Sequence, residues 1–349
     1  MRSTLLPVFA LVLCACSATA DRQPNVHVPS HTSQGAGGRP VTGDGQLTEY
    51  VRRIFQDSRG HYWFGSNGDG IYRFDGGALE VFSVQEGLAG SQVTGILEDR
   101  KGHIWIATDG GVSRYDPAAS ADSSGRAFVN YTTKQGLSSD GVWAIFETQD
   151  GTIWAGTAAG PCRFDGQGFT PFALKVEADM DKAGPWVLSI TQDRKGELYF
   201  GTEMGVFKTE GGIIQRIPAP NSSGDDMVPC VLVDSKDRVW CSSMTGGLTC
   251  YEQGTVKRFT APGDIGDNEV WTVFEDRQGH IWFCSEGFGV YRADGGTLRN
   301  YSTAQGLGVA AVQSIHQDQA GTLWFGGGGG LYRLQGDTMV EVRRNGPWR

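Results

Sequence analysis

The sequence repeats one phrase at a nearly constant interval, and this repetition constrains the fold more than any other feature. The phrase EDRKGHIWIATDGGVSRYD occupies residues 98–116, and most of it returns near residues 57, 276 and 318. Aligned on its tryptophan, the chain has seven registers, 41 to 49 residues apart: Trp63, Trp105, Trp154, Tyr199, Trp240, Trp282 and Trp324. A period of this length is typical of a supersecondary unit that stacks on copies of itself.

Each register can be translated into four short strands. An apolar run such as VTGIL (93–97) predicts an innermost strand, and the D-x-x-G segment after it predicts a tight turn. A glycine precedes the aromatic residue by three positions in six registers, and Asp237 replaces it in the fifth. We expect Asp237 to adopt the left-handed conformation that the turn needs. Segments such as HIWIAT (103–108), GVSRYD (111–116) and FVNYT (128–132) predict the other three strands.

Four antiparallel strands repeated seven times predict an all-β fold, a seven-bladed β-propeller of four-stranded antiparallel blades. Each sheet must cover both of its faces, and radial blades in a closed ring do this better than a solenoid, the rival architecture. The recurring tryptophans are expected to pack between blades. Every fourth strand follows its own third strand, so we expect blades one and seven to abut without a swapped strand. An additional edge strand at NVHV (25–28) is left open.

The pattern V-x-x-I-x-x-D-x-x-G-x-I-W-x-G-T, followed by G-G-V-x-R-Y-D, F-x-x-Y-T and Q-G-L, resembles the two-component regulator propeller repeat. The resemblance covers about residues 48–343. It implies a propeller of the kind found in the periplasmic sensor portion of hybrid two-component sensors. Those sensors usually continue into an immunoglobulin-like module, a membrane helix and a kinase, whereas this sequence ends soon after the seventh repeat. We therefore do not expect this chain to transduce a signal alone.

The N-terminal residues have the features of an export signal. Arg2 precedes an apolar run at 5–13, and Leu13-Cys14-Ala15-Cys16 resembles a bacterial lipobox. We expect a lipoprotein signal peptide at 1–16 with lipidation at Cys16, a flexible tether at 17–46, the propeller at 47–343 and a tail at 344–349. Ser17 resembles the sorting preference for an outer-membrane lipoprotein facing the periplasm. The rival is cleavage after Ala20, which would release a soluble periplasmic protein.

Charge and motifs exclude several classes of function. The formal net charge of −9 argues against nucleic acid or anionic lipid as a partner, because both would be repelled at long range. Membrane contact is therefore expected only through the lipid anchor. No Ser-His-Asp order, H-E-x-x-H motif or phosphate-binding loop is present, so neither catalysis nor a cofactor is expected. His61, His103 and His280 share one repeat position on the turn face, and His316 is expected to be a satisfied core residue.

Five cysteines follow the export signal: Cys162, Cys230, Cys241, Cys250 and Cys284. Counting outward from turns at 234–237 and 244–247 places Cys230 opposite Cys241, and Cys241 opposite Cys250. One of these pairs could form a disulfide in an exported protein. A three-thiolate metal site is disfavoured, because flat neighbouring strands do not wrap a tetrahedral ion.

The best candidates for function lie where the repeat is interrupted. By analogy with other propellers, the loops between fourth and first strands surround one mouth of a central funnel. Trp143 and Trp271 occupy a position where the other registers carry Arg52, Thr94, Leu188, Pro229 and Gln313, so no shared packing rule demands an indole there. Indoles near carboxylates and arginine suit sugar rings. The predicted ligand-binding residues are Tyr50, Arg52, Asp140, Trp143, Trp186, Glu269, Trp271 and Gln313.

Further residues are expected on the same face: Gln92 and Asn268 at the starts of innermost strands, and Asn67, Asp69, Asp109, Glu203, Glu286 and Phe288 of the loops between second and third strands. The alternative is that the indoles plug the funnel. The sequence thus predicts an exported propeller that binds an oligosaccharide or an envelope protein and is linked to sensing. Two other functions stay open. Streptogramin lyases are also seven-bladed propellers with G-x-I-W strands, and that resemblance implies a metal and paired histidines at the mouth. The third is a structural scaffold of an envelope complex.

Overall fold

The structure, a computed structural model, describes residues 37–118, 128–174, 185–211, 213–217, 227–252, 254–259, 269–294, 297–309 and 311–348. The chain divides into two units, 1–33 and 34–349, and the propeller lies in the second. The predicted signal peptide, Cys16 and the NVHV segment are outside the described residues. Within them, no helix is long and apolar enough to cross a membrane.

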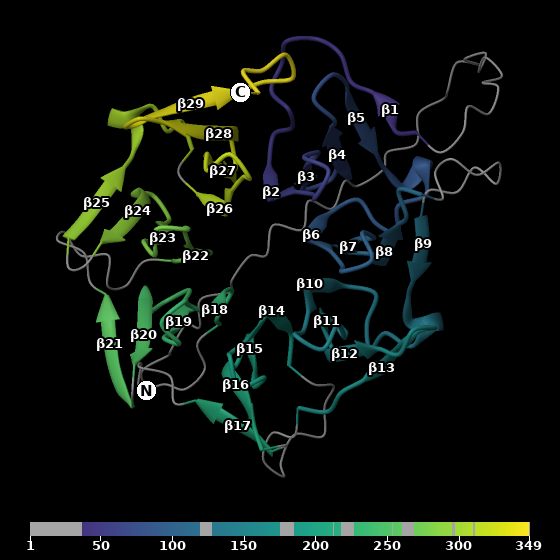
Figure 1. The fold of residues 1–349 in the computed structure, drawn as a ribbon, viewed down its shortest axis with the longest axis vertical. Helices are drawn as coiled ribbons and strands as arrows, with labels where there is room; N and C mark the ends of the chain where they lie inside the picture. The colour runs from purple at the N-terminus through teal and green to yellow at the C-terminus, as the bar shows by residue number, and fades with distance from the viewer. Residues whose placement is uncertain are drawn as a thin grey trace, which may run out of the picture. The chain divides into compact units, whose positions relative to one another are not determined.

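Seven antiparallel sheets follow one another around a ring, which confirms the predicted propeller (Figure 1). Blades 1 to 3 are β2 (Val51–Gln56), β3 (Tyr62–Ser66), β4 (Ile71–Phe74) and β5 (Leu79–Phe82); β6 (Val93–Glu98), β7 (Ile104–Thr108), β8 (Gly111–Tyr115) and β9 (Phe128–Tyr131); and β10 (Val142–Glu147), β11 (Ile153–Thr157), β12 (Gly160–Phe164) and β13 (Phe169–Pro171). The first strand of each blade is the innermost (Figure 1).

Blades 4 to 7 repeat this arrangement with β14 (Val187–Gln192), β15 (Leu198–Thr202), β16 (Gly205–Glu210) and β17 (Ile213–Ile217); β18 (Val231–Val233), β19 (Val239–Ser242), β20 (Leu248–Glu252) and β21 (Thr255–Phe259); β22 (Val273–Glu275), β23 (Ile281–Ser285), β24 (Gly289–Asp294) and β25 (Thr297–Tyr301); and β26 (Val312–Gln317), β27 (Leu323–Gly327), β28 (Gly330–Gln335) and β29 (Thr338–Val342). Short 3-10 helices follow blades 1, 2 and 6: η1 (Val84–Glu86), η3 (Thr133–Gln135) and η5 (Thr303–Gln305).

The turn aspartate explains why the phrase D-x-x-G-x-x-W recurs. One of its oxygens accepts the backbone N–H groups of the turn, as Asp57 Oδ1 does from His61 at 2.8 Å. The other oxygen accepts the indole N–H six residues later, at 2.7–2.9 Å in five blades. Asp193 instead accepts the Tyr199 hydroxyl at 3.3 Å. The sequence predicted the turn but not this carboxylate–indole bond. Asp237 has φ of 59°, as predicted.

The recurring tryptophans are buried between blades, which confirms their expected role. All six are at most 6% exposed. Trp282 of blade 6, for example, packs in one cluster with Val312, Ile315 and Phe325 of blade 7. Interdigitation of this kind covers both faces of every sheet.

Hydrogen bonds between blades form a ring on the turn face. In six blades a Gln or Glu precedes the turn residue. Its side chain accepts a backbone N–H from the preceding blade's turn: Ser58 donates to Glu98 at 2.7 Å and Arg277 to Gln317 at 2.8 Å. Gln319 donates to Gln56 at 2.7 Å, so the same contact also joins blade 7 to blade 1.

Blades 1 and 7 abut with no swapped strand among the described residues, as predicted. The closure is reinforced on the opposite face, where Gly329 N donates to Glu49 O at 2.9 Å and Arg344 N donates to Gly45 O at 3.0 Å. In addition, β1 (Arg39–Pro40) pairs with β5 as a fifth strand of the first sheet. The segment expected to be a tether therefore contributes residues to the domain.

The predicted cysteine pairings are wrong by one position. Val231, not Cys230, is opposite Cys241, and Trp240, not Cys241, is opposite Cys250. The turns hold three residues between their closing pairs, Asp234–Arg238 and Ser243–Gly247, rather than the two assumed in the count. Because side chains alternate across a strand, Cys241 and Cys250 lie on opposite faces of the sheet. All five cysteines are free.

Candidate ligand-binding site at the funnel mouth

A buried valine marks the start of the innermost segment in every blade: Val51, Val93, Val142, Val187, Val228, Val270 and Val312, each at most 4% exposed. The positions on either side of it vary. Tyr50, Trp186 and Glu269 precede the valine, and Arg52, Trp143, Trp271 and Gln313 follow it. In five blades the strand register shifts at the position after the valine, which makes that residue a β-bulge. A bulged residue has no ladder partner to match, so its side chain is free to vary.

An aromatic pair lies at this mouth. Trp143 of blade 3 and Trp186 of blade 4 stack with ring centroids 5.8 Å apart and an interplanar angle of 18°. The guanidinium carbon of Arg52 is 5.8 Å from the centroid of Trp143. All three side chains are half-buried, in contrast to the tryptophans between blades. The structure thus brings together three of the predicted residues from three blades.

Polar contacts connect blades 1 and 2 beside this pair. Arg52 Nη1 donates to Asn67 Oδ1 at 2.7 Å, and Gln92 Nε2 donates to the same oxygen at 2.6 Å. Burial lowers the pKa of Arg52, and the charges of Tyr50 and Asp109 oppose that shift. Burial raises the pKa of Tyr50, whose hydroxyl also senses Arg52 and Glu286. Tyr50 is therefore near groups from both blade 1 and blade 6.

A second group of predicted residues comes from blade 6. Trp271 Nε1 donates to Glu286 Oε2 at 2.8 Å, and Glu286 N donates to Glu269 O at 3.0 Å. Burial, followed by the hydrogen bond and negative charge of Glu286, raises the pKa of Glu269. Trp143 and Trp271 are thus equivalent in sequence but differ in environment. One stacks on a second indole, whereas the other is held by a carboxylate.

Three predicted or excluded residues lie apart from these groups. Asp140 Oδ1 accepts the backbone N–H of Thr133 at 2.6 Å, so this carboxylate caps the η3 turn. Gln313 contributes its backbone carbonyl to Arg53 Nη1 at 3.5 Å. His316 differs from the expected satisfied core residue, because its buried Nε2 has no hydrogen-bond partner. Burial lowers its pKa to about 4, which makes the ring neutral at pH 7.

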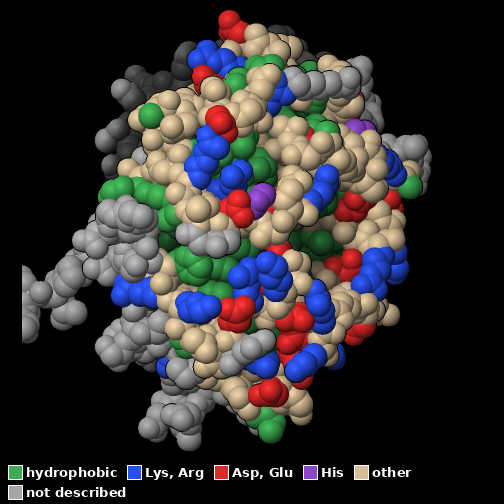
Figure 2. All heavy atoms as spheres, turned by 60° about the vertical axis from the view of Figure 1, so that its left-hand side comes forward, with side chains coloured by type: hydrophobic (Ala, Val, Ile, Leu, Met, Phe, Trp, Pro, Cys, Tyr) green, Lys and Arg blue, Asp and Glu red, His purple; other side chains and the backbone are tan. Residues whose placement is uncertain are grey.

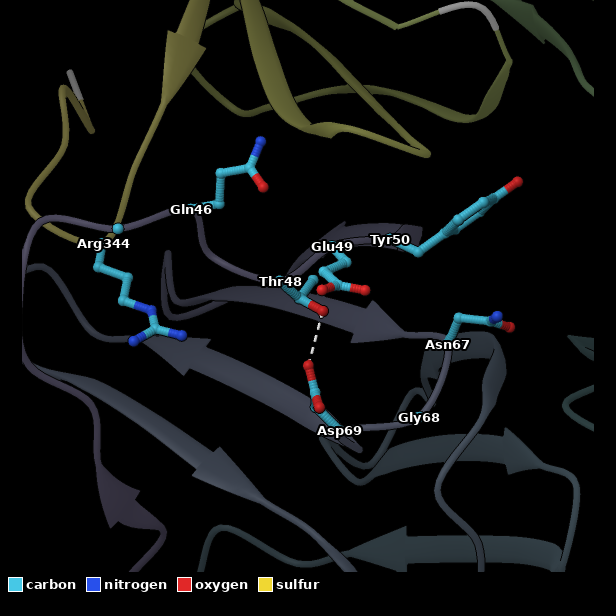
Figure 3. Close-up of a pocket in the computed structure, with 9 residues that line it drawn as sticks. Gln46, Thr48, Glu49, Tyr50, Asn67, Gly68, Asp69 and Arg344 are labelled. Atoms are coloured by element: carbon cyan, nitrogen blue, oxygen red, sulfur yellow. Dashed lines mark hydrogen bonds between the residues drawn. The ribbon is translucent and has the colours of Figure 1, made fainter. Parts of the chain in front are cut away.

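An open pocket of about 770 Å³ adjoins the mouth where the ring closes (Figure 3). Its lining includes Tyr50 and Asn67 at one end and Arg344 at the other, and the first two side chains point away from Arg344. Thr48 Oγ1 donates to Asp69 Oδ2 at 2.7 Å within it. Arg344 was not among the predicted site residues, because residues 344–349 were expected to form a tail.

Solved structures with this fold include proteins of several functions. The extracellular domain of a putative hybrid two-component system from B. thetaiotaomicron is 21% identical, with a TM-score of 0.65, over 81% of this chain and 39% of that one. A streptogramin B lyase is 16% identical with a TM-score of 0.67, over 85% of this chain and 97% of the lyase. PorZ, a surface component of the type-IX secretion system of Porphyromonas gingivalis, is 16% identical with a TM-score of 0.62, over 85% and 48%.

These likenesses establish the fold. The chain spans about two fifths of the length of the sensor domain that it matches. No curated protein matches the sequence. A family model does: residues 45–68, 87–110, 136–159 and 264–287 match the two component regulator propeller. Each of the four segments runs from the approach to an innermost strand into the second strand or the turn after it. Segments of blades 1, 2, 3 and 6 therefore match the two component regulator propeller repeat, and the seven-bladed fold agrees with that match.

Proposed function

We propose that this chain is an exported, ligand-binding propeller of a sensing system, and that it recognises an oligosaccharide at the funnel mouth. The observation that carries the proposal is the half-buried Trp143–Trp186 stack, set where the repeat itself requires no indole. Large aromatic faces with polar groups at their edge are suited to sugar rings, whose C–H faces stack while their hydroxyls form hydrogen bonds. Arg52, Asn67 and Gln92 supply such polar groups beside the stack.

The family of the repeats and the fold of the sensor domain from B. thetaiotaomicron support the link to sensing. The export signal and the lipobox ending at Cys16 support an envelope location with a lipid anchor. In this proposal the propeller is the ligand-binding part of the sensing system.

The test is titration of the protein with neutral oligosaccharides, followed by calorimetry. Trp143→Ala and Trp186→Ala should each weaken binding about five- to tenfold, since each removes about 1–1.5 kcal/mol of aromatic contact. Trp348→Ala is the matched control, because Trp348 stacks on Phe74 at 4.4 Å, away from the mouth residues. If the unsubstituted chain and the three variants bind with equal affinity, the ligand does not bind at the Trp143–Trp186 stack.

The lyase alternative has less support. A virginiamycin B lyase from Staphylococcus aureus with one histidine replaced by alanine is catalytically inactive. In this chain, His316 is the only histidine on an innermost strand among the described residues. His61, His103 and His280 lie beside turn aspartates instead, as in the His103 Nδ1–Asp99 Oδ2 contact of 2.9 Å. Release of a cleaved product from a streptogramin by the purified protein would nevertheless overturn the binding proposal.

A further inference from the structure

Arg53 breaks a second set of equivalent positions, on the innermost strands one residue beyond the bulge. The residue two places after the buried valine is small in the other six blades: Gly95, Ala144, Ser189, Cys230, Thr272 and Ser314. Packing explains the small side chains at this position, because the position faces the next blade. A Cβ at Gly95 would lie 3.1 Å from Ile145 Cγ2, and the Ser314 hydroxyl accepts the Ile54 N–H at 3.0 Å.

The long side chain of Arg53 therefore extends along the innermost strands. Its Nη1 donates to the carbonyl of Arg52 at 2.8 Å and to that of Gln313 in blade 7 at 3.5 Å. Its charge also opposes the burial that raises the pKa of Cys230 in blade 5. These contacts place the guanidinium of Arg53 beside the innermost strands of blades 1 and 7.

Arg52 and Arg53 have no carboxylate within ion-pairing distance among the described residues. Their acceptors are a side-chain amide and two backbone carbonyls. On the side of the domain drawn in Figure 2, acidic and basic side chains are interspersed. Both side chains are half-buried. A partly desolvated cation without a counter-ion is costly, and two adjacent ones are more so. Burial and the neighbouring Arg52 lower the pKa of Arg53 to about 10, which leaves it charged at pH 7.

We propose that Arg53, with Arg52 beside it, forms an anion-binding site beside these innermost strands, which accepts a carboxylate or a sulfate group. A guanidinium presents parallel N–H donors that match these planar or tetrahedral oxyanions. Arg52 is also 5.8 Å from the Trp143 ring, so one ligand can reach both sites. The anion is either a free ion or the acidic group of a sugar stacked on the indoles. Only the second source rests on the proposed function.

The experiment measures sulfate and glucuronate binding to the full chain by calorimetry at constant pH, with glucose as the neutral counterpart of glucuronate. Arg53→Gln should weaken the binding of both anions about tenfold or more, since a hydrogen bond to a charged group is lost. Arg53→Lys should restore part of it. Arg114→Gln is the control: Arg114 resembles Arg52 in lying over a tryptophan, 5.7 Å from Trp105, and in having a buried Nε without a partner, but it is on a third strand.

A crystal soaked in sodium bromide should show bromide at the Arg53 guanidinium. Sulfate binding without glucuronate binding would support a site for free ions, and tighter binding of glucuronate than of glucose would support an acidic sugar. The inference is overturned if neither anion binds or if Arg53→Gln binds the anions as tightly as the unsubstituted chain does. It is also overturned if Arg114→Gln loses as much anion affinity as Arg53→Gln. A melting temperature of Arg53→Gln at or above that of the unsubstituted chain would confirm that the variant folds. Neutral sugar binding that depends on Trp143 would test the proposed function separately.

Discussion

Replacing Asp318 with alanine should cause the largest loss of stability of any single change in the turn face. This carboxylate belongs to blade 7 and is 2% exposed. It accepts the Trp324 indole N–H at 2.8 Å, the Thr322 N–H at 2.8 Å and the Tyr62 hydroxyl of blade 1 at 2.7 Å. It therefore stabilises the turn, the inter-blade indole and the seam at which the ring closes.

The magnitude follows from the donors that would lose their acceptor. The Trp324 indole is 1% exposed, so its N–H would remain unsatisfied in a dry core. A buried donor without a partner costs about 1–3 kcal/mol, and loss of the tyrosine and turn bonds brings the expected destabilisation to about 3–5 kcal/mol. Asp318→Asn keeps the shape and one acceptor, and should cost about 1–2 kcal/mol.

The assay is urea unfolding followed by tryptophan fluorescence. Asp150→Ala provides the control: it removes an acidic residue from the corresponding turn of blade 3, where Thr148 replaces the indole-binding aspartate and bonds Asp150. That change should cost less than about 1 kcal/mol. If Asp318→Ala and Asp150→Ala shift the midpoint equally, the carboxylate–indole bond does not stabilise the fold and our reasoning is wrong.

Further predictions concern pH, backbone and thiols. Indole and backbone donors lower the pKa values of the turn carboxylates Asp99, Asp234, Asp276 and Asp318. These carboxylates therefore stabilise the fold above about pH 4, and the stabilisation is lost as pH falls through their lower native pKa values. Unfolding measured during acid titration should show this loss, and Asp318→Asn should lose less stability than the unsubstituted chain. Gly136 has φ of 92°, and a Cβ there would overlap the Phe169 carbonyl, whereas Gly166 has φ of 102° and lies in open space. Gly136→Ala should therefore lower the melting temperature well beyond Gly166→Ala. Equal shifts of the melting temperature would refute the steric explanation. Alkylation and mass spectrometry should find all five propeller cysteines as free thiols, and a linked pair of peptides would contradict the register.

Local rules sufficed for the parts of the fold that repeat. The apolar runs predicted the innermost strands, the D-x-x-G segment predicted the turn, and Asp237 followed because the same backbone conformation was needed. The carboxylate–indole bond was missed although its spacing of six residues was visible. The preference of tight turns for aspartate already explained this residue, so a second role as acceptor of the indole N–H was not predicted.

Register and long-range proximity could not be obtained in this way. A turn with one more residue than assumed moved every cysteine pairing by one position, because side-chain direction alternates along a strand. The predicted mouth residues lie at or shortly before the starts of innermost strands, yet only the structure separates Trp143, stacked on Trp186, from Trp271, bonded to Glu286. Arg53 did have a signal in the sequence, as the one large residue at a position that is otherwise small.

If the mouth binds a ligand as proposed, the buried valine serves the fold and the residues beside it serve recognition. The buried valine is the same in all seven blades because it packs between them, whereas the residues that flank it are released from that constraint. Arg52 and Arg53 show the consequence within one strand: Arg52 contacts Asn67 and the Trp143 ring, and Arg53 reaches the Gln313 carbonyl of blade 7. Specificity should therefore reside in blades 1, 3, 4 and 6, which place charged or aromatic side chains beside the valine. Changes beside the valine of blade 5, where Met227 and Pro229 flank it, should leave recognition largely intact.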